Sequence, residues 1–323
     1  MEKKKSEWPR LFAGIFLILV VASLLFWLRM YHLIFADIVV LSFAAFGLYE
    51  MLKAFSKAWT TPQNLQSAVA DPQADSARET FSGKPVIRPM WLQALFVFVA
   101  MYPLTLFYHE AGIMISLILG VLLTFSMLLF TKRYGLKDAI VTIISFVYPM
   151  SILMLAVLIN RVYGGLLGIV LILITAIATD TLAFVGGKLF GRTKLIPEVS
   201  PKKTVEGAIS GIFGGIAGAM LVFLMDHYNV FAFFAREDEL GHILDPAVHS
   251  TGIIITVYVI AGFFAAIFTQ LGDLTASYVK RRVGIKDFGN VIPGHGGVLD
   301  RIDGILFVAP IIYIILRVIY QIA

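Results

Sequence analysis

Long apolar runs are the feature that most constrains the fold of this 323-residue chain. A bilayer core is roughly 30 Å thick, so a helix needs about 20 apolar residues to cross it. In lipid, a backbone segment must satisfy its own hydrogen bonds, which favours helices. We therefore predict an all-α polytopic membrane protein with about nine transmembrane helices. The nine runs lie at about residues 11–28, 33–55, 91–108, 112–130, 139–159, 165–190, 208–226, 252–276 and 304–322.

The composition agrees with this class and limits the chemistry. Hydrophobic residues make up 59% of the chain and charged residues only 15%. Cysteine is absent, so disulfides and thiolate metal sites are excluded, and a metal would need oxygen or imidazole ligands. The net charge of +5 does not by itself indicate nucleic-acid binding. In a membrane protein Lys and Arg gather in the loops on one side, and we expect no nucleic-acid partner.

Lys and Arg are distributed unevenly between the two sides of the membrane. With nine spans, 22 of the 26 basic residues fall on one side. Cytoplasmic loops carry such an excess. The N-terminus is thus predicted to be cytoplasmic and the C-terminus to lie on the opposite side. As a separate expectation, the chain is a multi-pass protein of the bacterial plasma (inner) membrane. The basic side comprises residues 1–10, 53–90, 131–138, 188–207 and 277–303.

Two regions are expected along the chain. Residues 1–110 form an N-terminal transmembrane region with a flexible, polar cytoplasmic linker at 56–90, and residues 111–323 form a C-terminal catalytic region. The glycine-rich spans 164–187 and 207–218 are expected to pack closely against neighbouring helices, because small residues let helix backbones approach.

Three acidic residues in the spans have ordinary explanations. Asp37 and Asp226 lie near span ends, where Asp226 is expected to face water. Glu50 is followed by Lys53, which indicates a local i,i+3 ion pair. Exposed or paired charges of this kind cost little and need no functional explanation.

Asp180 and Asp273 are stronger candidates for function. Asp180 lies well inside a span and has no basic neighbour in sequence, so its partner must be another helix or an ion. Asp273 lies near a span end and is followed by the basic cluster 280–282. A carboxylate beside Lys and Arg suits a cation that in turn binds phosphate. The alternative is a carboxylate that simply reaches the membrane surface.

The start of the last span adds two more carboxylates. Asp300 and Asp303 share one face of the helix start. Capping needs only one of them, whereas two neighbouring carboxylates would repel unless a cation such as Mg²⁺ bridged them. Just before them, residues 293–297 (PGHGG) have the exposed amides of an anion-binding loop. This glycine run is weak support alone, because it lacks the P-loop spacing.

A second basic loop occupies residues 186–207. Ser200 and Pro201 in it predict a turn, and Thr204 and Glu206 could cap the following helix. Two such loops on one side of the membrane could enclose a nucleoside triphosphate. The basic residues of this loop are Lys188, Arg192, Lys194, Lys202 and Lys203.

The stretch from Ser277 to Asp303 resembles the C-terminal signature of the phosphatidate cytidylyltransferases, or CDP-diacylglycerol synthases. Every fixed element of that 27-residue pattern is present: Ser277, Lys280-Arg281, Lys286-Asp287, Gly289, His295-Gly296-Gly297 and Asp300-Arg301-x-Asp303. Upstream blocks are similar too: Asp180 with Gly186-Gly187-Lys188 and Gly191-Arg192, Ser200 to Thr204 with Glu206-Gly207, and Gln270 to Leu274. The resemblance covers residues 165–323. Two departures are Ala276, where the family has an acidic residue, and Val205, where it often has Trp.

This resemblance implies that CTP and phosphatidate react to give CDP-diacylglycerol and pyrophosphate. It also implies Mg²⁺, with K⁺ as a second cation, and a homodimer. The lipid phosphate would attack the α-phosphorus of CTP in line, so the protein mainly positions groups and neutralises charge. A phosphate monoester is already a nucleophile, so His295 is expected to be a loop residue or phosphate contact rather than a base.

The expected site residues fall into three groups. The catalytic group is Asp273, Asp300, Lys280 and Arg281. The metal group is Asp273, Asp300, Asp303 and Asp180. The substrate-binding group is Lys188, Ser200, Lys202, Lys203, Thr204, Glu206, Lys286, Asp287, His295, Gly296, Gly297 and Arg301.

Two other classes of protein remain open. Intramembrane carboxylates and glycine-broken helices also suit a transporter, although its site would lie near the membrane midplane rather than at one end. Another CTP-using membrane enzyme, such as a polyprenol kinase or an archaeal-lipid cytidylyltransferase, is the second alternative. The Asp-Gly-x-x-Ala-Arg pattern of CDP-alcohol phosphotransferases is absent.

Overall fold

The computed structural model describes residues 33–58, 90–131, 134–162, 164–230, 242–244, 246, 248–289 and 296–322. The predicted span at 11–28, most of the predicted linker at 56–90 and His295 lie outside these residues. In chain order the elements are α2 (Leu33–Ala58), α5 (Trp91–Tyr108), α6 (Glu110–Phe130), α7 (Leu136–Ser145), η1 (Phe146–Ser151), α8 (Ile152–Arg161), α9 (Gly165–Phe190), β1 (Lys194–Ile196), β2 (Ser200–Thr204), α10 (Val205–His227), α11 (Thr251–Val283) and α12 (Leu299–Ile322).

The described part of the chain contains eight helical segments that are long and apolar enough to cross a membrane. They correspond to the second through ninth predicted runs, and α7, η1 and α8 together make up one of them, residues 136–161. The all-α polytopic class is therefore confirmed. The helical break at η1 contains Pro149, which lacks the amide hydrogen that a continuous helix requires.

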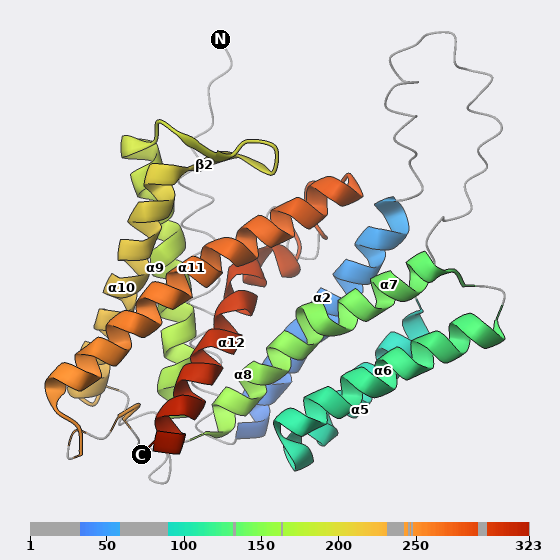
Figure 1. Ribbon diagram of the computed structural model, residues 1–323, viewed down its shortest axis with the longest axis horizontal. Helices are drawn as coiled ribbons and strands as arrows, with labels where there is room; N and C mark the ends of the chain where they lie inside the picture. The colour runs from blue at the N-terminus through green and yellow to red at the C-terminus, as the bar shows by residue number, and fades with distance from the viewer. Residues whose placement is uncertain are drawn as a thin grey trace.

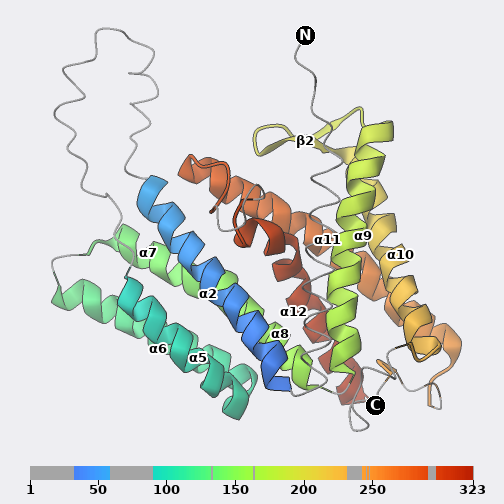
Figure 2. The same cartoon turned by 180° about the vertical axis from the view of Figure 1, so that it is seen from behind.

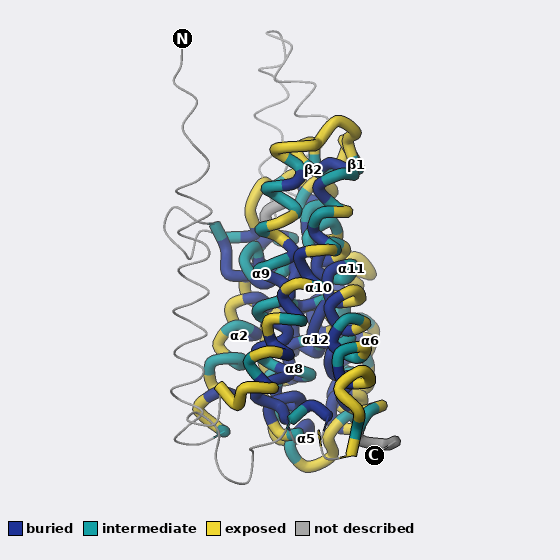
Figure 3. The backbone as a smooth tube through the Cα atoms, turned by 90° about the vertical axis from the view of Figure 1, so that its left-hand side faces the viewer, coloured by how far each residue is buried: buried dark blue, intermediate teal, exposed yellow. Residues whose placement is uncertain are grey.

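Helix α12 occupies a central place in the bundle. It packs against α11 and α9 on one side and against α8 and α2 on the other, as Figures 1 and 2 show from opposite directions. The hairpin β1–β2 projects beyond the end of the bundle, and Figure 3 shows the exposed hairpin above a largely buried interior. Residues at the start of α12 are thus enclosed by helices from both halves of the chain.

Helix α10 packs closely on its neighbours through glycines. A methyl group on Gly214 would lie 2.5 Å from the carbonyl oxygen of Ala178 in α9. One on Gly215 would lie 2.7 Å from the carbonyl oxygen of Gly262 in α11. Only glycine permits such backbone contact, so the close packing predicted for the glycine-rich spans is confirmed.

Two local predictions near the basic loops were wrong. Helix α11 continues to Val283, well beyond the predicted end at 276, and places the basic cluster 280–282 on a helix. It ends at Gly284, which has a φ of +75°, the left-handed conformation that glycine adopts at helix ends. Ser200 and Pro201 lie in strand β2 rather than in a turn, because Ser200 pairs with Ile196 of β1.

The end of the bundle opposite the hairpin contains buried carboxylates. Asp226 was expected to face water, but its side chain is only 7% exposed. It accepts a hydrogen bond from the Tyr258 hydroxyl at 2.7 Å, and its other oxygen lies 2.6 Å from Nδ1 of His242. These partners satisfy the buried carboxylate without water.

Asp37 is also buried at this end, with a side-chain exposure of 0%. It forms an ion pair with Arg161. Its carboxylate also accepts hydrogen bonds from Nδ2 of Asn160 and the Tyr102 hydroxyl, both at 3.0 Å. The charge is therefore fully engaged by structural partners.

Candidate active site

Two lysine–aspartate pairs join three elements at the hairpin end of the bundle. Nζ of Lys203 in β2 lies 2.6 Å from Oδ2 of Asp273 in α11. Nζ of Lys280, two turns further along α11, lies 2.7 Å from Oδ1 of Asp300 in α12. Residues that sequence patterns assigned to separate loops and helix ends therefore lie close together.

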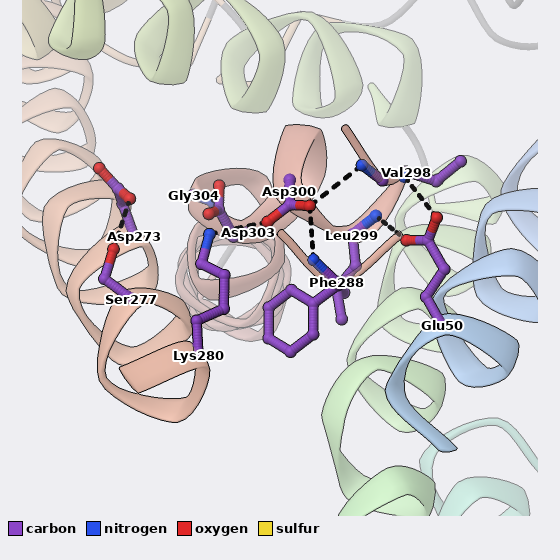
Figure 4. Close-up of polar contacts among 11 residues, drawn as sticks. Glu50, Asp273, Ser277, Lys280, Phe288, Val298, Leu299, Asp300, Asp303 and Gly304 are labelled. Atoms are coloured by element: carbon purple, nitrogen blue, oxygen red, sulfur yellow. Dashed lines mark hydrogen bonds and ion pairs between the residues drawn. The ribbon is translucent and has the colours of Figure 1, made fainter. Parts of the chain in front are cut away.

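Asp300 also organises the loop between α11 and α12. Its Oδ2 accepts hydrogen bonds from the amides of Phe288 at 2.9 Å and Gly297 at 3.0 Å, while Oδ1 binds Lys280. Figure 4 shows this carboxylate between the lysine and the loop. Gly296 beside it has a φ of +87°, which L-amino acids with side chains rarely adopt. Both carboxylate oxygens of Asp300 thus have a defined partner.

Asp303 lies one turn along α12, where this helix touches α11. A methyl group on Gly272 would lie 2.4 Å from the carbonyl oxygen of Asp303. The Asp303 carboxylate accepts a hydrogen bond from the Gly304 amide at 2.9 Å and interacts electrostatically with Asp273. The contact between the two helices therefore brings both carboxylates to the same part of the site.

Asp180 of α9 is the third member of this group. It interacts electrostatically with Asp273, Asp303 and Lys203. Asp180 is exposed by its accessible surface area, although many protein atoms lie around its carboxylate. Asp180 forms no hydrogen bond or ion pair with another described residue. It is therefore a carboxylate without a fixed partner in this part of the structure.

These acids are suited to holding a cation together with substrate phosphates. Four carboxylates, Asp180, Asp273, Asp300 and Asp303, share the region with two lysines, Lys203 and Lys280. Among the described residues, no three acidic or histidine side chains are close enough to hold a metal by themselves. Mg²⁺ is usually held by one or two carboxylates, with phosphates and water as its remaining ligands. The region has two more carboxylates than lysines, and carboxylate oxygens are ligands that Mg²⁺ accepts, so these residues fit that arrangement.

The hairpin is held by residues that were expected to bind substrate. Oγ1 of Thr204 accepts a hydrogen bond from the Gly207 amide at 3.1 Å, so the predicted helix cap is confirmed. The Glu206 carboxylate accepts hydrogen bonds from the Arg192 and Thr193 amides, both at 3.1 Å. Glu206 thereby fastens the base of the hairpin to the start of α10.

Other predicted binding residues surround this core with their side chains more open to solvent. Arg281 is exposed, and its Nε donates a long hydrogen bond of 3.4 Å to the Val199 carbonyl in the hairpin turn. Ser200 and Arg301 are half-buried. His295 lies outside the described residues. The exposed members of the group are Lys188, Lys202, Lys286 and Asp287.

One loop amide that was expected to be exposed already has a partner within the protein. The amide of Gly297 was expected to help cradle an anion, but it donates to Asp300. The next two amides, of Val298 and Leu299, donate to the carboxylate of Glu50 in α2 at 3.0 and 2.8 Å. These donors are therefore occupied by carboxylates of the protein itself.

Glu50 was expected to pair with Lys53, and that expectation was wrong. The Glu50 side chain is buried, whereas Nζ of Lys53 turns to the hydroxyl of Tyr49 at 3.1 Å. The other unexpected residue is Tyr148 in η1, which lies within electrostatic range of Asp303 and has a buried hydroxyl without a hydrogen-bond partner in the described structure. The place of neither residue has a local sequence signal, because the neighbouring groups come from helices far away in sequence.

Comparison with known proteins gives relatives with one shared name. Phosphatidate cytidylyltransferase 5, chloroplastic, of Arabidopsis thaliana is 38% identical over 153 residues, which are 47% of this chain and 32% of the relative. The phosphatidate cytidylyltransferase of Rickettsia bellii is 39% identical over 139 residues, 43% of this chain and 52% of the relative. That of Staphylococcus saprophyticus is 36% identical over 138 residues, 43% of this chain and 44% of the relative.

These matches span about a third to a half of the length of the curated relatives. The family model described as "Cytidylyltransferase family" extends much further and matches residues 8–319. That range includes every described helix up to the last turn of α12. The chain therefore belongs to the cytidylyltransferase family.

Proposed function

We propose that this protein is a phosphatidate cytidylyltransferase, which converts CTP and phosphatidate to CDP-diacylglycerol and pyrophosphate in phospholipid biosynthesis. Membership of the cytidylyltransferase family and the names of three relatives support this activity. The observation that carries the proposal is the pair of lysine–aspartate contacts, Lys203 with Asp273 and Lys280 with Asp300. Two phosphate groups repel each other, so a site that brings them together needs lysine side chains to contact their oxygens. It also needs carboxylates that can hold a metal cation between them.

The reaction brings together two anionic substrates. An oxygen of the phosphatidate phosphate bonds to the α-phosphorus of CTP, the bond from that phosphorus to the bridging oxygen breaks, and pyrophosphate leaves. The main demands are alignment and charge neutralisation. Lys203 and Lys280 would supply donors to phosphate oxygens, and Asp273 and Asp300 hold these lysines in place before substrates arrive.

Mg²⁺ would be held by Asp273 and Asp300, with Asp303 and Asp180 as further oxygen ligands and K⁺ as a second cation. When bound, these cations would offset the negative charge of the phosphates. The protein side chains would orient the two substrates around that charge. Arg281 and Lys202 would provide outer contacts to the triphosphate, since both are exposed beside the hairpin.

The place of the site suits one lipid and one soluble substrate. It lies at one end of a bundle of membrane-length helices, beside the hairpin (Figure 1). The basic loops predict that this end faces the cytoplasm of a bacterial cell, where CTP is available. A homodimer is part of the proposal. The grouping of Asp180, Asp273, Asp300 and Asp303 at the hairpin end disfavours a transporter, whose site would lie near the midplane.

The test is an assay of the purified full chain in mixed micelles that contain Mg²⁺. CTP, UTP, GTP and ATP are compared with phosphatidate as acceptor, and phosphatidate is then compared with a polyprenol and with a polyprenyl phosphate. We expect pyrophosphate release and CDP-diacylglycerol, detected by mass spectrometry, only with CTP and phosphatidate together. Transfer of phosphate from CTP to a polyprenol, without a cytidylyl lipid, would refute the proposal.

A further inference from the structure

A carboxylate from outside the family signature holds the start of α12. Glu50 lies in α2, and its side chain is only 1% exposed. Oε1 accepts a hydrogen bond from the Val298 amide at 3.0 Å, and Oε2 accepts one from the Leu299 amide at 2.8 Å. Figure 4 shows Glu50 reaching from α2 to the loop that precedes Asp300.

The loop is shaped around this carboxylate. A methyl group on Gly289 would lie 2.2 Å from Oε1 of Glu50, and one on Gly297 would lie 2.5 Å from Oε2. Neither glycine has a φ in the left-handed range, so backbone conformation alone does not demand glycine at these positions. Contact with Glu50 is the constraint that the structure shows at both.

Glu50 and Asp300 divide the amides at the start of α12 between them. The Gly297 amide donates to Asp300, while the next two amides donate to Glu50. The first amides of a helix have no partner within the helix, and the helix dipole favours an anion there. Because Glu50 satisfies two of these donors, Asp300 is free to hold Gly297, Phe288 and Lys280 at the same time.

We propose that Glu50 is a positioning residue of the active site, which sets the orientation of Asp300 by fixing the first turn of α12. It touches neither substrate and acts through Asp300. The functional part of this inference rests on the proposed cytidylyl transfer. It assigns the N-terminal region, which lies outside the signature, a direct part in the geometry of the reaction.

The first test measures the contact without turnover. In Glu50→Gln the new amide nitrogen faces one of the two backbone donors, so one of the two hydrogen bonds is lost. Hydrogen exchange of the full-length protein should become faster in peptides that cover residues 297–303. Asp37→Asn is the matched control, because Asp37 is a buried carboxylate near the start of the same helix, whereas Glu50 lies in its second half. It should leave exchange in that segment unchanged.

The second test measures catalysis. Partners that orient active-site ligands typically contribute about 10- to 100-fold to activity. Glu50→Gln should therefore lower kcat at least about tenfold while KM for CTP changes less than about threefold. Asp37→Asn should leave kcat per folded molecule unchanged even where its unfolding temperature falls. Equal kcat in Glu50→Gln and the wild type would overturn the positioning role.

A double-mutant cycle separates positioning from general damage to the fold. Gly289→Ala alone should lower kcat about tenfold because its methyl group displaces Glu50. In the Glu50→Ala background the same change should cost less than about threefold, since the obstructed group is gone. Fully additive losses would contradict the proposal. A wild type that fails to use phosphatidate would refute the proposed substrate, while the exchange experiment would still decide the Glu50 contact.

Discussion

Carboxylates at the two ends of the bundle have different kinds of partner. At the hairpin end, Asp273 pairs with Lys203, and their side chains are 34% and 26% exposed. At the opposite end, Asp37 is fully buried and pairs with Arg161. Lysine is a compact charge on a flexible stem, whereas arginine presents a planar set of donors suited to permanent pairing.

This contrast separates Asp273, whose partly exposed lysine can change partners, from Asp37, whose carboxylate is fully buried. A partly exposed lysine can leave its carboxylate for a substrate phosphate at little cost, because exposed ion pairs contribute little stability. Removing one partner from the network around Asp37 would strand a buried charge, which is costly. Aspartate therefore has a proposed role in catalysis at the hairpin end, as Asp273, and a structural role at the opposite end, as Asp37.

The largest effect is expected at Asp300. Asp300→Asn removes the charge that holds Lys280 and would help to hold a cation. Loss of one preorganised electrostatic group typically costs about 10²- to 10³-fold in kcat. Pyrophosphate release from CTP plus phosphatidate should fall by that factor at an unchanged level of protein in the membrane. Full activity in this variant would refute the role of Asp300.

Asp37→Asn should show the opposite pattern. Because Arg161 is 28% exposed, its stranded charge is partly hydrated, and we expect a loss of about 2 kcal/mol in the free energy of unfolding. Denaturation in detergent measures this loss, and a parallel assay should show unchanged turnover per folded molecule. If Asp37→Asn were as stable as the wild type but had low activity, Asp37 would have a role in catalysis and the contrast with Asp273 would fail.

Lys203→Gln is expected to have an intermediate effect. The variant loses a donor to phosphate but little stability, since the pair with Asp273 is partly exposed. A charge-assisted hydrogen bond contributes about 1.5–3 kcal/mol, so KM for CTP should rise about tenfold or more. Lys203→Arg, which keeps the charge, serves as the comparison. If Lys203→Gln instead lowered thermal stability strongly and left KM unchanged, the lysine would belong to the architecture.

The smallest effect is expected for Arg78→Ala. Arg78 lies in the predicted linker at 56–90, outside the described residues and far in sequence from the signature. Turnover should equal that of the wild type in the same micelle assay. A loss above about tenfold, more than one neutral hydrogen bond is typically worth, would mean that the linker contributes to the site.

The positions of the eight described spans could be predicted because they depend on the length of each apolar run, which is a local property. The grouping of Asp273, Asp300 and Asp303 could be predicted in outline from helix ends and spacing. Their individual partners could not, since a pair such as Lys203 with Asp273 depends on how α10 and α11 cross. The assignment of metal ligands stays a prediction.

Glu50 shows most clearly where local reasoning fails. Lys53 lies at the right spacing for an ion pair, and an apolar helix gives no hint of a distant amide partner. The contacts of Glu50 join residues 248 and 249 positions apart. The prediction that Asp226 faces water failed for the same reason, because its partner Tyr258 is 32 positions away. Both carboxylates lie near span ends, where hydropathy does not separate a water-facing charge from a buried one.

The glycine contacts of α10 have a mechanical consequence. Backbone atoms of α10 meet those of α9 and α11 directly, and close-packed backbones resist sliding or rotation. Strand β2 continues into α10, so Lys203 is carried on this stiff three-helix unit together with Asp273. The 2.6 Å contact between Lys203 and Asp273 is therefore set by the packing of these three helices rather than by a flexible loop.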